Sequence, residues 1–324
     1  MRQMRNLKYL LLLLLLPGLA ACTKQRRHFD KIEVVETNTT SRLNKIKFVN
    51  DTLCLVAGGE RFLKAEMLAS TDGGRTWSAR AYDEVQKGLY ELEVSPTGAI
   101  YAAAFDGKML FSRDVAQSWT YREIGNWEFH VGMAFAGDDR LVMVSRDGQR
   151  TGKIVIVDSQ LNVLKTHAFD FGLNDVAMIT PQVGYACGYG VVLKTYDAGD
   201  TWEYLDIKND NFLAMTCVGT SDVWVCGYAG SVFHSSDAGT SWQRLRNGNS
   251  ITIPKYHLQD ILFTDLNNGW AVGEKGLIIR TTDGGQNWTP YNKLTEVGLN
   301  SIARSPDGSL LVCGEAGKLF RISL

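Results

Sequence analysis

The sequence predicts an all-β fold: a single seven-bladed β-propeller built from four-stranded blades. One observation is a turn motif, an Asp followed by small residues and a closing Trp, that recurs along the 324-residue chain. A second is its spacing, because successive copies lie 39 to 46 residues apart. A third is that the apolar runs between copies are too short for helices and are bounded by glycines. Several short strands per repeat at this period indicate a propeller.

The clearest copy of the turn follows two short apolar runs, Trp270–Val272 and Leu277–Ile279, and extends from Thr281 to Trp288 (TTDGGQNW). An Asp side chain can accept hydrogen bonds from backbone N–H groups further along the turn, and glycines adopt backbone angles closed to other residues. The flat Trp suits the seam between two sheets. This is the Asp-box (BNR) repeat. Five copies keep both the Asp and the Trp, although the one at Asp114 has lost its glycine: Asp72 and Trp77, Asp114 and Trp119, Asp197 and Trp202, Asp237 and Trp242, and Asp283 and Trp288.

Two weaker repeats complete the count of seven. Asp158 lies in phase between Asp114 and Asp197, and the segment 314–321 matches 273–280 but ends before its own turn. At the other end, residues 29–36 (FDKIEVVE) alternate like a strand yet precede the first full repeat. We therefore expect the N-terminal strand to complete the last blade as its outermost strand, which closes the ring and covers a sheet edge.

The first residues resemble the export signal of a bacterial lipoprotein. Basic residues precede a short apolar run, and Leu-Ala-Ala-Cys, ending at Cys22, resembles a lipobox. This resemblance implies a signal peptide over residues 1–21, lipidation of Cys22, a tether over residues 22–28 and a propeller over residues 29–324. The protein would then be exported and anchored in the cell envelope, facing the periplasm or in the outer membrane. The alternative is an ordinary signal peptide with a chance Cys.

Charge and cysteine content exclude several classes of function. Without residues 1–21 the chain keeps 31 of its 34 basic residues against 35 acidic ones, so nothing favours a nucleic-acid partner. Five cysteines remain beyond Cys22, an odd number, and Cys187, Cys226 and Cys313 occupy strand positions typical of core residues. The five histidines lack metal-ligand spacing. The sequence therefore indicates no disulfide framework, no metal and no cofactor.

The polar residues leave one enzymatic alternative open. We interpret the Asp turns as structural. The sialidase Phe/Tyr-Arg-Ile-Pro motif is missing, and Arg304 is the one arginine expected inside an inner strand. Glu274 and Glu315 occupy equivalent hairpins of neighbouring blades, so they could form a carboxylate pair for glycoside cleavage. A carbohydrate-active propeller, glycan-binding or hydrolytic, is therefore the alternative to a non-enzymatic binding protein.

The segment from Gly269 to Trp288 (GWAVGEKGLIIRTTDGGQNW) resembles the photosystem II assembly/stability factor family, and residues 184–202 and 222–242 match it more loosely. This resemblance implies a seven-bladed, non-enzymatic assembly factor that binds partner proteins. The lipobox departs from the family pattern. The resulting expectation is a monomeric propeller lipoprotein that binds a protein, or else a glycan, at the cell envelope.

The expected binding surface lies where the loops depart from the minimal repeat. The longest insertion, residues 247–256, should share one face with the hairpins that join second and third strands, and the loop over residues 58–66 is the next candidate. Tyrosines with cationic neighbours are typical of interaction hot spots. The predicted partner-binding residues are Tyr189, Tyr228, Lys255, Tyr256, His257 and Glu274.

Overall fold

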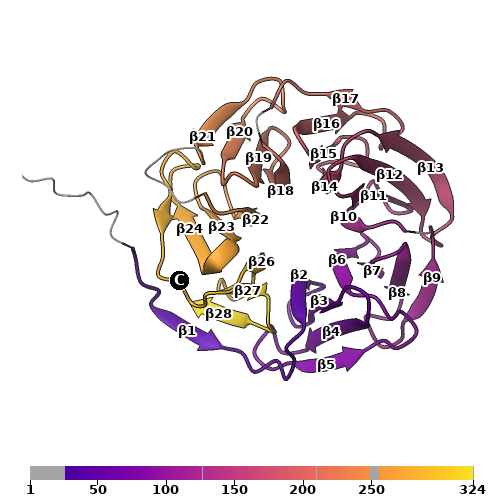
Figure 1. The fold of residues 1–324 in the computed structure, drawn as a ribbon, viewed down its shortest axis with the longest axis horizontal. Coiled ribbons are helices and arrows are strands. Elements are labelled where there is room, and N and C mark those ends of the chain that lie inside the picture. The colour runs from indigo at the N-terminus through magenta and orange to yellow at the C-terminus, as the bar shows by residue number, and fades with distance from the viewer. Residues whose placement is uncertain (1–25, 126, 209, 249–254, 324) are drawn as a thin grey trace, which may run out of the picture.

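A computed structural model describes residues 26–125, 127–208, 210–248 and 255–323. Its strands form seven four-stranded antiparallel sheets arranged as blades around a central axis (Figure 1). The predicted fold class is confirmed. In each of blades 1 to 6 the chain builds the sheet outward from the axis, strand by strand.

The strand bounds of the first four blades are as follows. Blade 1 holds β2 (Arg42–Phe48), β3 (Cys54–Glu60), β4 (Lys64–Ser70) and β5 (Ser78–Ala81). Blade 2 holds β6 (Leu89–Val94), β7 (Ile100–Ala104), β8 (Lys108–Ser112) and β9 (Thr120–Glu123). Blade 3 holds β10 (His130–Phe135), β11 (Arg140–Asp147), β12 (Thr151–Asp158) and β13 (Val163–Phe169). Blade 4 holds β14 (Leu173–Met178), β15 (Gly184–Gly188), β16 (Val191–Thr195) and β17 (Glu203–Tyr204).

The remaining blades follow the same plan. Blade 5 holds β18 (Phe212–Val218), β19 (Asp222–Gly227), β20 (Val232–Ser235) and β21 (Gln243–Arg246). Blade 6 holds β22 (Leu258–Phe263), β23 (Gly269–Gly273), the single turn η1 (Glu274–Gly276), β24 (Leu277–Thr281) and β25 (Thr289–Pro290). Blade 7 holds β26 (Leu299–Arg304), β27 (Leu310–Gly314), β28 (Leu319–Ser323) and the N-terminal β1 (Lys31–Val34). No helix within the described residues has the length and hydropathy to cross a membrane.

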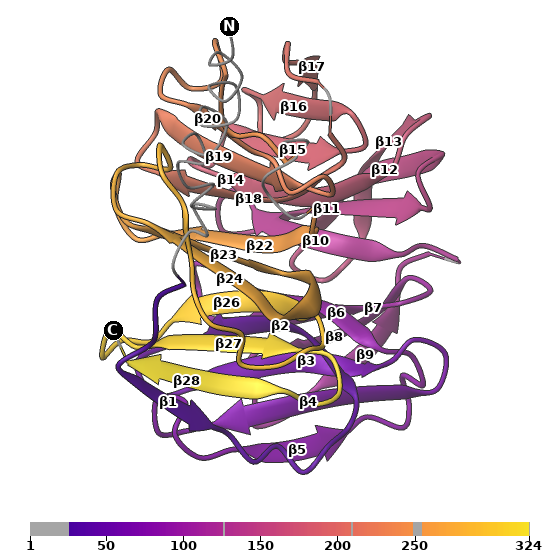
Figure 2. The same ribbon diagram turned by 60° about the vertical axis from the view of Figure 1, so that its left-hand side comes forward.

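The ring closes through blade 7, as predicted. Strand β1 pairs antiparallel with β28, from Lys31 opposite Ser323 to Val34 opposite Phe320, so the first and last strands share one sheet (Figures 1 and 2). The strand is shorter than the predicted 29–36. Phe29 instead stacks on Tyr291 of blade 6, with ring centroids 4.4 Å apart. The N-terminal segment 29–34 therefore contacts blades 6 and 7.

The core is distributed over the seams between blades. Buried apolar side chains form seven clusters, each spanning two neighbouring blades. The second strand of a blade supplies much of each cluster, as β15 does with five consecutive buried residues. Cys187, Cys226 and Cys313 are fully buried in these clusters as free thiols. Each blade is therefore stabilised mainly by its neighbours.

The Asp-box turns lie at the outer ends of these seams. In blade 5, Asp237 accepts hydrogen bonds from the backbone N–H and hydroxyl of Ser241, at 2.8 and 2.6 Å. The next residue, Ala238, has a positive φ of 57°, and its carbonyl accepts hydrogen bonds from Tyr185 Oη and Lys194 Nζ of blade 4. This turn thus orders its own loop and offers a carbonyl to the preceding blade, as the turns of blades 1, 4 and 6 also do.

The weakened copy in blade 3 keeps this contact without a closing Trp. Asp158 accepts hydrogen bonds from the backbone N–H groups of Gln160 and Asn162. The Ser159 carbonyl accepts hydrogen bonds from Tyr101 Oη and Arg113 Nη2 of blade 2, at 2.9 and 3.0 Å. The link between blades therefore depends on the turn conformation more than on the Trp.

Candidate functional site

The innermost strands, which line the central channel, share one irregularity in all seven blades. Each innermost strand has a β-bulge near its start, for example between Leu43 and Lys45 in β2 and between Leu173 and Asp175 in β14. The residue after each bulge occupies an equivalent register position. We call these seven positions the channel ring: Lys45, Glu91, Gly132, Asp175, Ala214, Asp260 and Ser301.

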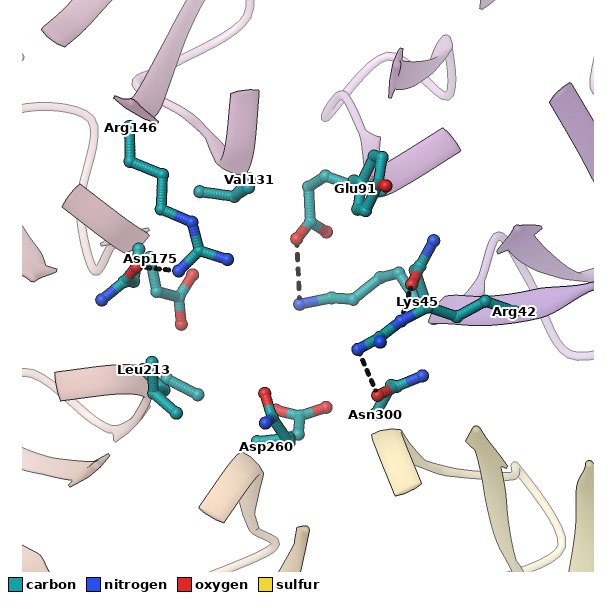
Figure 3. A pocket seen from close by; sticks show the side chains of 14 residues that line it. Arg42, Lys45, Glu91, Val131, Arg146, Asp175, Leu213, Asp260 and Asn300 are labelled. Carbon is teal, nitrogen blue, oxygen red and sulfur yellow. Dashed lines mark hydrogen bonds and ion pairs between the residues drawn. The ribbon is translucent and has the colours of Figure 1, made fainter. Parts of the chain in front are cut away.

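The channel ring combines one cation with three carboxyl groups. Lys45 Nζ lies 3.3 Å from Glu91 Oε2, while Asp175 and Asp260 face the channel from across it (Figure 3). Burial raises the pKa of Glu91 to about 7 and that of Asp175 to about 6. Burial opposes the charge on Lys45, but the carboxylates of Glu91, Asp260 and Asp175 outweigh it and raise the pKa of Lys45. Lys45 is therefore the internal counterion of the ring.

Two of these carboxyl groups also join neighbouring blades. Asp175 Oδ2 accepts a hydrogen bond from the Met215 backbone N–H of blade 5 at 2.8 Å. Asp260 Oδ2 accepts hydrogen bonds from the Ile302 backbone N–H and the Ser301 hydroxyl of blade 7, at 3.0 and 2.9 Å. The residual cavity at this level has a volume of only about 110 Å³. The ring thus serves as the floor of the channel and holds its inner strands in register.

Above the floor, the channel opens into a wide basic mouth. Arg42, Arg61 and Arg146, from blades 1 and 3, line a cavity of about 690 Å³. Burial lowers the pKa of Arg146 to about 10, and the nearby charges of Arg61 and Arg42 add to this effect. Three guanidinium groups in one cavity repel one another. The mouth is therefore suited to an anionic group that would relieve this repulsion.

The three arginines are only partly neutralised by the protein. Arg42 Nη1 lies 3.0 Å from Glu315 Oε1, and its other nitrogens donate to Asn44 and Asn300. Arg61 and Arg146 instead lie over the ring of Phe129, at 5.1 and 5.4 Å from its centroid, and Arg146 donates to Asn174. Among the described residues, neither of these two forms an ion pair with a carboxylate. They can bind a carboxylate from outside.

Part of the predicted binding surface lies on this mouth. Tyr228 and His257 line the cavity and their rings are in contact. Glu274 orients His257, since its carboxylate lies 3.0 Å from His257 Nδ1 and accepts from its backbone N–H. Burial lowers the pKa of His257. Tyr189 is exposed nearby and forms a backbone bridge to Asn211, another residue of the mouth.

The other predicted residues lie beside the insertion. The Lys275 ammonium group lies over the ring of Tyr256, 5.2 Å from its centroid, and Lys255 is exposed. Residues 249–254 of the insertion lie outside the described residues, as do the predicted signal peptide and Cys22. The structure thus brings Tyr228, His257 and Glu274 together at the mouth.

The enzymatic alternative gains nothing from the geometry. Glu274 contacts His257, whereas Glu315 contacts Arg42 and accepts from the Gly298 backbone N–H. Each carboxylate thus accepts a hydrogen bond from the backbone of the loop that leads into its own blade. Arg304, expected inside the channel, is exposed at the far end of β26, because the strand ends there and its side chain reaches solvent.

Sequence reasoning missed the channel ring and the mouth arginines. The sequence did carry a signal for the ring, because a charged residue stands two positions after an equivalent Leu in Leu43-Asn44-Lys45 and in Leu173-Asn174-Asp175. The arginines come from three different positions of the repeat, so no repeat pattern relates them.

Comparisons with known proteins agree with this fold. No protein-family model matches the sequence. Over 153 residues the chain is 24% identical to the photosystem II assembly lipoprotein Ycf48 of Synechococcus sp. strain CC9902, covering 45% of this chain and 44% of that protein. Over 177 residues it is 25% identical to the chloroplastic photosystem II stability/assembly factor HCF136 of Oryza sativa subsp. japonica, covering 46% and 42%. The chain spans less than half the length of these relatives.

Solved structures show the same architecture over nearly the whole chain. YCF48 from Cyanidioschyzon merolae superimposes with a TM-score of 0.69 at 17% identity, covering 90% of this chain and 98% of that one. A structure of YCF48 bound to D1 peptide superimposes with a TM-score of 0.71 at 16% identity, covering 94% and 100%. The chain is therefore an Asp-box propeller similar to photosystem II assembly factors, and the relatives named here are assembly factors rather than enzymes.

Proposed function

We propose that this propeller is a non-enzymatic binding module that takes up a partner protein at its basic mouth, in an assembly or scaffolding role. Both curated relatives are named as assembly factors, and one similar solved structure holds a bound peptide. A peptide segment with a carboxylate, either an acidic side chain or a chain terminus, is the partner feature that best fits three arginines.

The observation that carries this proposal is the arrangement of Arg42, Arg61 and Arg146 around one open cavity. Guanidinium groups bind carboxylates through two parallel hydrogen bonds, and this geometry makes Arg the preferred residue for such contacts. The carboxyl groups of the floor would repel a carboxylate that entered further. A bound carboxylate would thus stop at the level of the arginines.

The remaining sector of the mouth would contact the polar flanks of the same segment. Tyr228 and His257 face the cavity beside Gln259, and Tyr189, Lys255, Tyr256 and Glu274 lie around them in blades 4 to 6. Aromatic side chains with cationic neighbours provide large contact areas at small entropic cost. We include these six residues in the proposed binding surface.

The cell-envelope setting is also part of the proposal. Residues 1–21 would be removed as a signal peptide, and Cys22 would carry the lipid that anchors the chain to a membrane. Replacing Cys22 by Ala should then move the protein from the membrane fraction to the soluble fraction. Retention of the variant in membranes after a high-salt wash would contradict the lipid anchor while leaving the mouth proposal untouched.

The mouth is tested with fluorescein-labelled acidic peptides that end in a free carboxylate, titrated with purified propeller and followed by anisotropy. The double variant Arg61→Gln/Arg146→Gln should weaken binding at least tenfold and reduce its salt dependence. Arg304→Gln, which removes an exposed arginine at the far end of β26, is the matched control and should leave binding unchanged. Equal binding by wild type and the double variant would refute the role of the mouth.

The sector in blades 4 to 6 is tested by the triple variant Tyr189→Ser/Tyr228→Ser/Tyr256→Ser. Its fold is checked by circular dichroism, and partner capture is measured from an envelope extract after cross-linking. Loss of the same cross-linked partner from the triple variant and from Arg61→Gln/Arg146→Gln would support one continuous surface. Unchanged capture by the triple variant would restrict binding to the other side of the mouth.

A further inference from the structure

We infer that an aromatic platform beside the mouth binds a bulky apolar side chain of the same partner segment whose carboxylate the arginines bind. The platform consists of Phe62, Leu63 and Trp127, supported by Phe105 and Phe129. This inference rests on the proposed function and sharpens it. The partner segment would carry a large apolar residue, aromatic by preference, at a fixed distance from its acidic group.

The platform consists of large apolar side chains that are unusually exposed to solvent. Phe62 is 58% exposed, Leu63 is 73% exposed and Trp127 is 79% exposed. Phe62 and Leu63 lie in the hairpin between β3 and β4, and Trp127 lies in the connection from β9 to β10. Both loops contact the hairpin between β7 and β8, where Phe62 packs against Phe105 and the Trp127 backbone N–H donates to Asp106. Grouped exposed apolar side chains of this size mark interaction sites.

The platform is held in place by its surroundings. The ring of Phe62 packs edge-on against Phe105, with centroids 5.2 Å apart. The Trp127 backbone N–H donates to Asp106 Oδ1 at 2.6 Å, and the neighbouring Glu128 binds Lys153 at 2.6 Å. Trp127 adopts a positive φ of 59°, an unfavourable conformation for a bulky residue. The fold therefore fixes this Trp in an exposed position at a cost in free energy.

Arg61 connects the platform to the mouth. Its guanidinium group lies 5.8, 5.5 and 5.1 Å from the ring centroids of Phe62, Phe105 and Phe129, and the same residue lines the mouth cavity. Lys87 adds a second cation, 5.6 Å from the Phe62 ring. A carboxylate bound by Arg61 would therefore have an apolar surface beside it.

This continuity favours a protein segment over a lipid surface as the occupant. Exposed Trp, Phe and Leu side chains with basic neighbours also occur where proteins dip into bilayers. A bilayer, however, is flat and cannot follow the surface from the platform down into a concave cavity lined by Arg146. An extended peptide can make both contacts at once, because its side chains alternate along a flexible backbone.

The test uses a set of labelled peptides of equal length and charge, each with the same acidic C-terminus. One peptide has no large apolar residue, and in the others a single Trp replaces Ser at successive positions. For the wild-type propeller, Trp at one or two adjacent positions should tighten binding at least tenfold. In the double variant Phe62→Ser/Trp127→Ser this preference should vanish, while the Trp-free peptide should bind as before.

Tyr204→Ser removes another exposed aromatic ring, 64% exposed in β17 of blade 4, and is the matched control that should keep the preference. If Phe62→Ser/Trp127→Ser kept the preference, or if wild type lacked it, the platform would be overturned. In either case, peptide binding that still depended on Arg61 and Arg146 would uphold the mouth. Failure of every peptide to bind would overturn both proposals. Loss of binding to anionic lipid vesicles, with an unchanged peptide preference, would assign the platform to a membrane instead.

Discussion

The same chemical group performs opposite tasks at the rim and at the centre of this propeller. At the rim, the Ser241 hydroxyl and backbone N–H, with help from Ser235, lower the pKa of Asp237 to about 2. At the centre, burial raises the pKa of Glu91 to about 7. The rim turn supplies donors that keep its carboxylate charged, whereas at Glu91 and Asp175 burial outweighs the backbone donors and the single lysine that the central carboxyl groups share.

The difference also shows where the repeats are free to diverge. Six blades have an Asp at the same position of the rim turn, because in each copy this Asp orders the turn. The seven positions of the channel ring hold residues that range from Gly132, without a side chain, to Lys45. The residues of the rim turns therefore recur from blade to blade, whereas the residues of the centre and mouth differ between blades.

The largest effect should follow from removing the cation of the channel. Lys45→Met leaves Glu91, Asp175 and Asp260 without their shared counterion, and we expect a loss of about 3 kcal/mol in the free energy of unfolding. Urea denaturation measures it. Adding Glu91→Gln to the same chain should recover part of the loss, since one buried charge disappears. A loss no larger than that of a surface substitution would show that the lysine is not the counterion.

The pH dependence of stability should have opposite signs in the two regions. Because the folded pKa of Glu91 is raised to about 7 from 4.5, its contribution is largest below pH 4.5 and falls as the pH rises through 7. We expect Glu91→Gln to remove a decline of about 2 kcal/mol between pH 5 and pH 8. Asp237 contributes above pH 3.8 and loses its contribution as the pH falls towards 2. Parallel pH profiles for wild type and Glu91→Gln would contradict this assignment.

A rim carboxylate should matter less than the channel lysine. Asp283→Ala removes the acceptor for the Asn287 backbone N–H and for the Thr281 hydroxyl, at 2.9 and 2.8 Å. We expect the midpoint of thermal unfolding to fall by only a few degrees, because water can replace these partners. Asp206→Ala, whose side chain is almost fully exposed, is the control and should melt like wild type. A loss as large as that of Lys45→Met would erase the distinction between rim and centre.

The smallest effect should be a gain at the rim. Val115 occupies the glycine-type position of the blade 2 turn with a φ of 56°, where a β-branched residue is strained. Val115→Gly should raise the free energy of unfolding by up to about 1 kcal/mol. Val163→Gly, at an exposed site in β13, should lower it instead, because glycine weakens a strand. A stability loss in Val115→Gly would show that the turn tolerates the side chain without strain.

The repeating part of the molecule could be predicted from the sequence because each repeat carries its own evidence. Asp237 and Trp242 belong to one turn, and local hydrogen bonds explain them without reference to other blades. The closure of blade 7 could also be predicted, since an orphan strand at one end matched an incomplete repeat at the other. These inferences need only short-range chemistry and the rule that sheet edges are covered.

The mouth could not be predicted in the same way because its residues occupy unrelated positions. Arg42 begins an inner strand, Arg61 lies in a hairpin, and Arg146 lies near the end of β11, which is longer than the second strands of the other blades. Their proximity depends on the diameter of the propeller and on how far β11 extends beyond the channel ring. Trp127 was missed for another reason: it is one of the few tryptophans outside the Asp-box turns, and its exposure depends on its contact with Asp106.

The closure of the ring by β1 gives the molecule a defined weak point under tension and a defined last step in folding. The first strand of the propeller pairs with its last, so blade 7 cannot form until synthesis of the propeller is complete. A pull on the N-terminus acts directly on the four residue pairs from Lys31 to Val34. The contacts of Arg27 and Phe29 with blade 6 divert part of that load to a neighbouring seam before it reaches the closing strand.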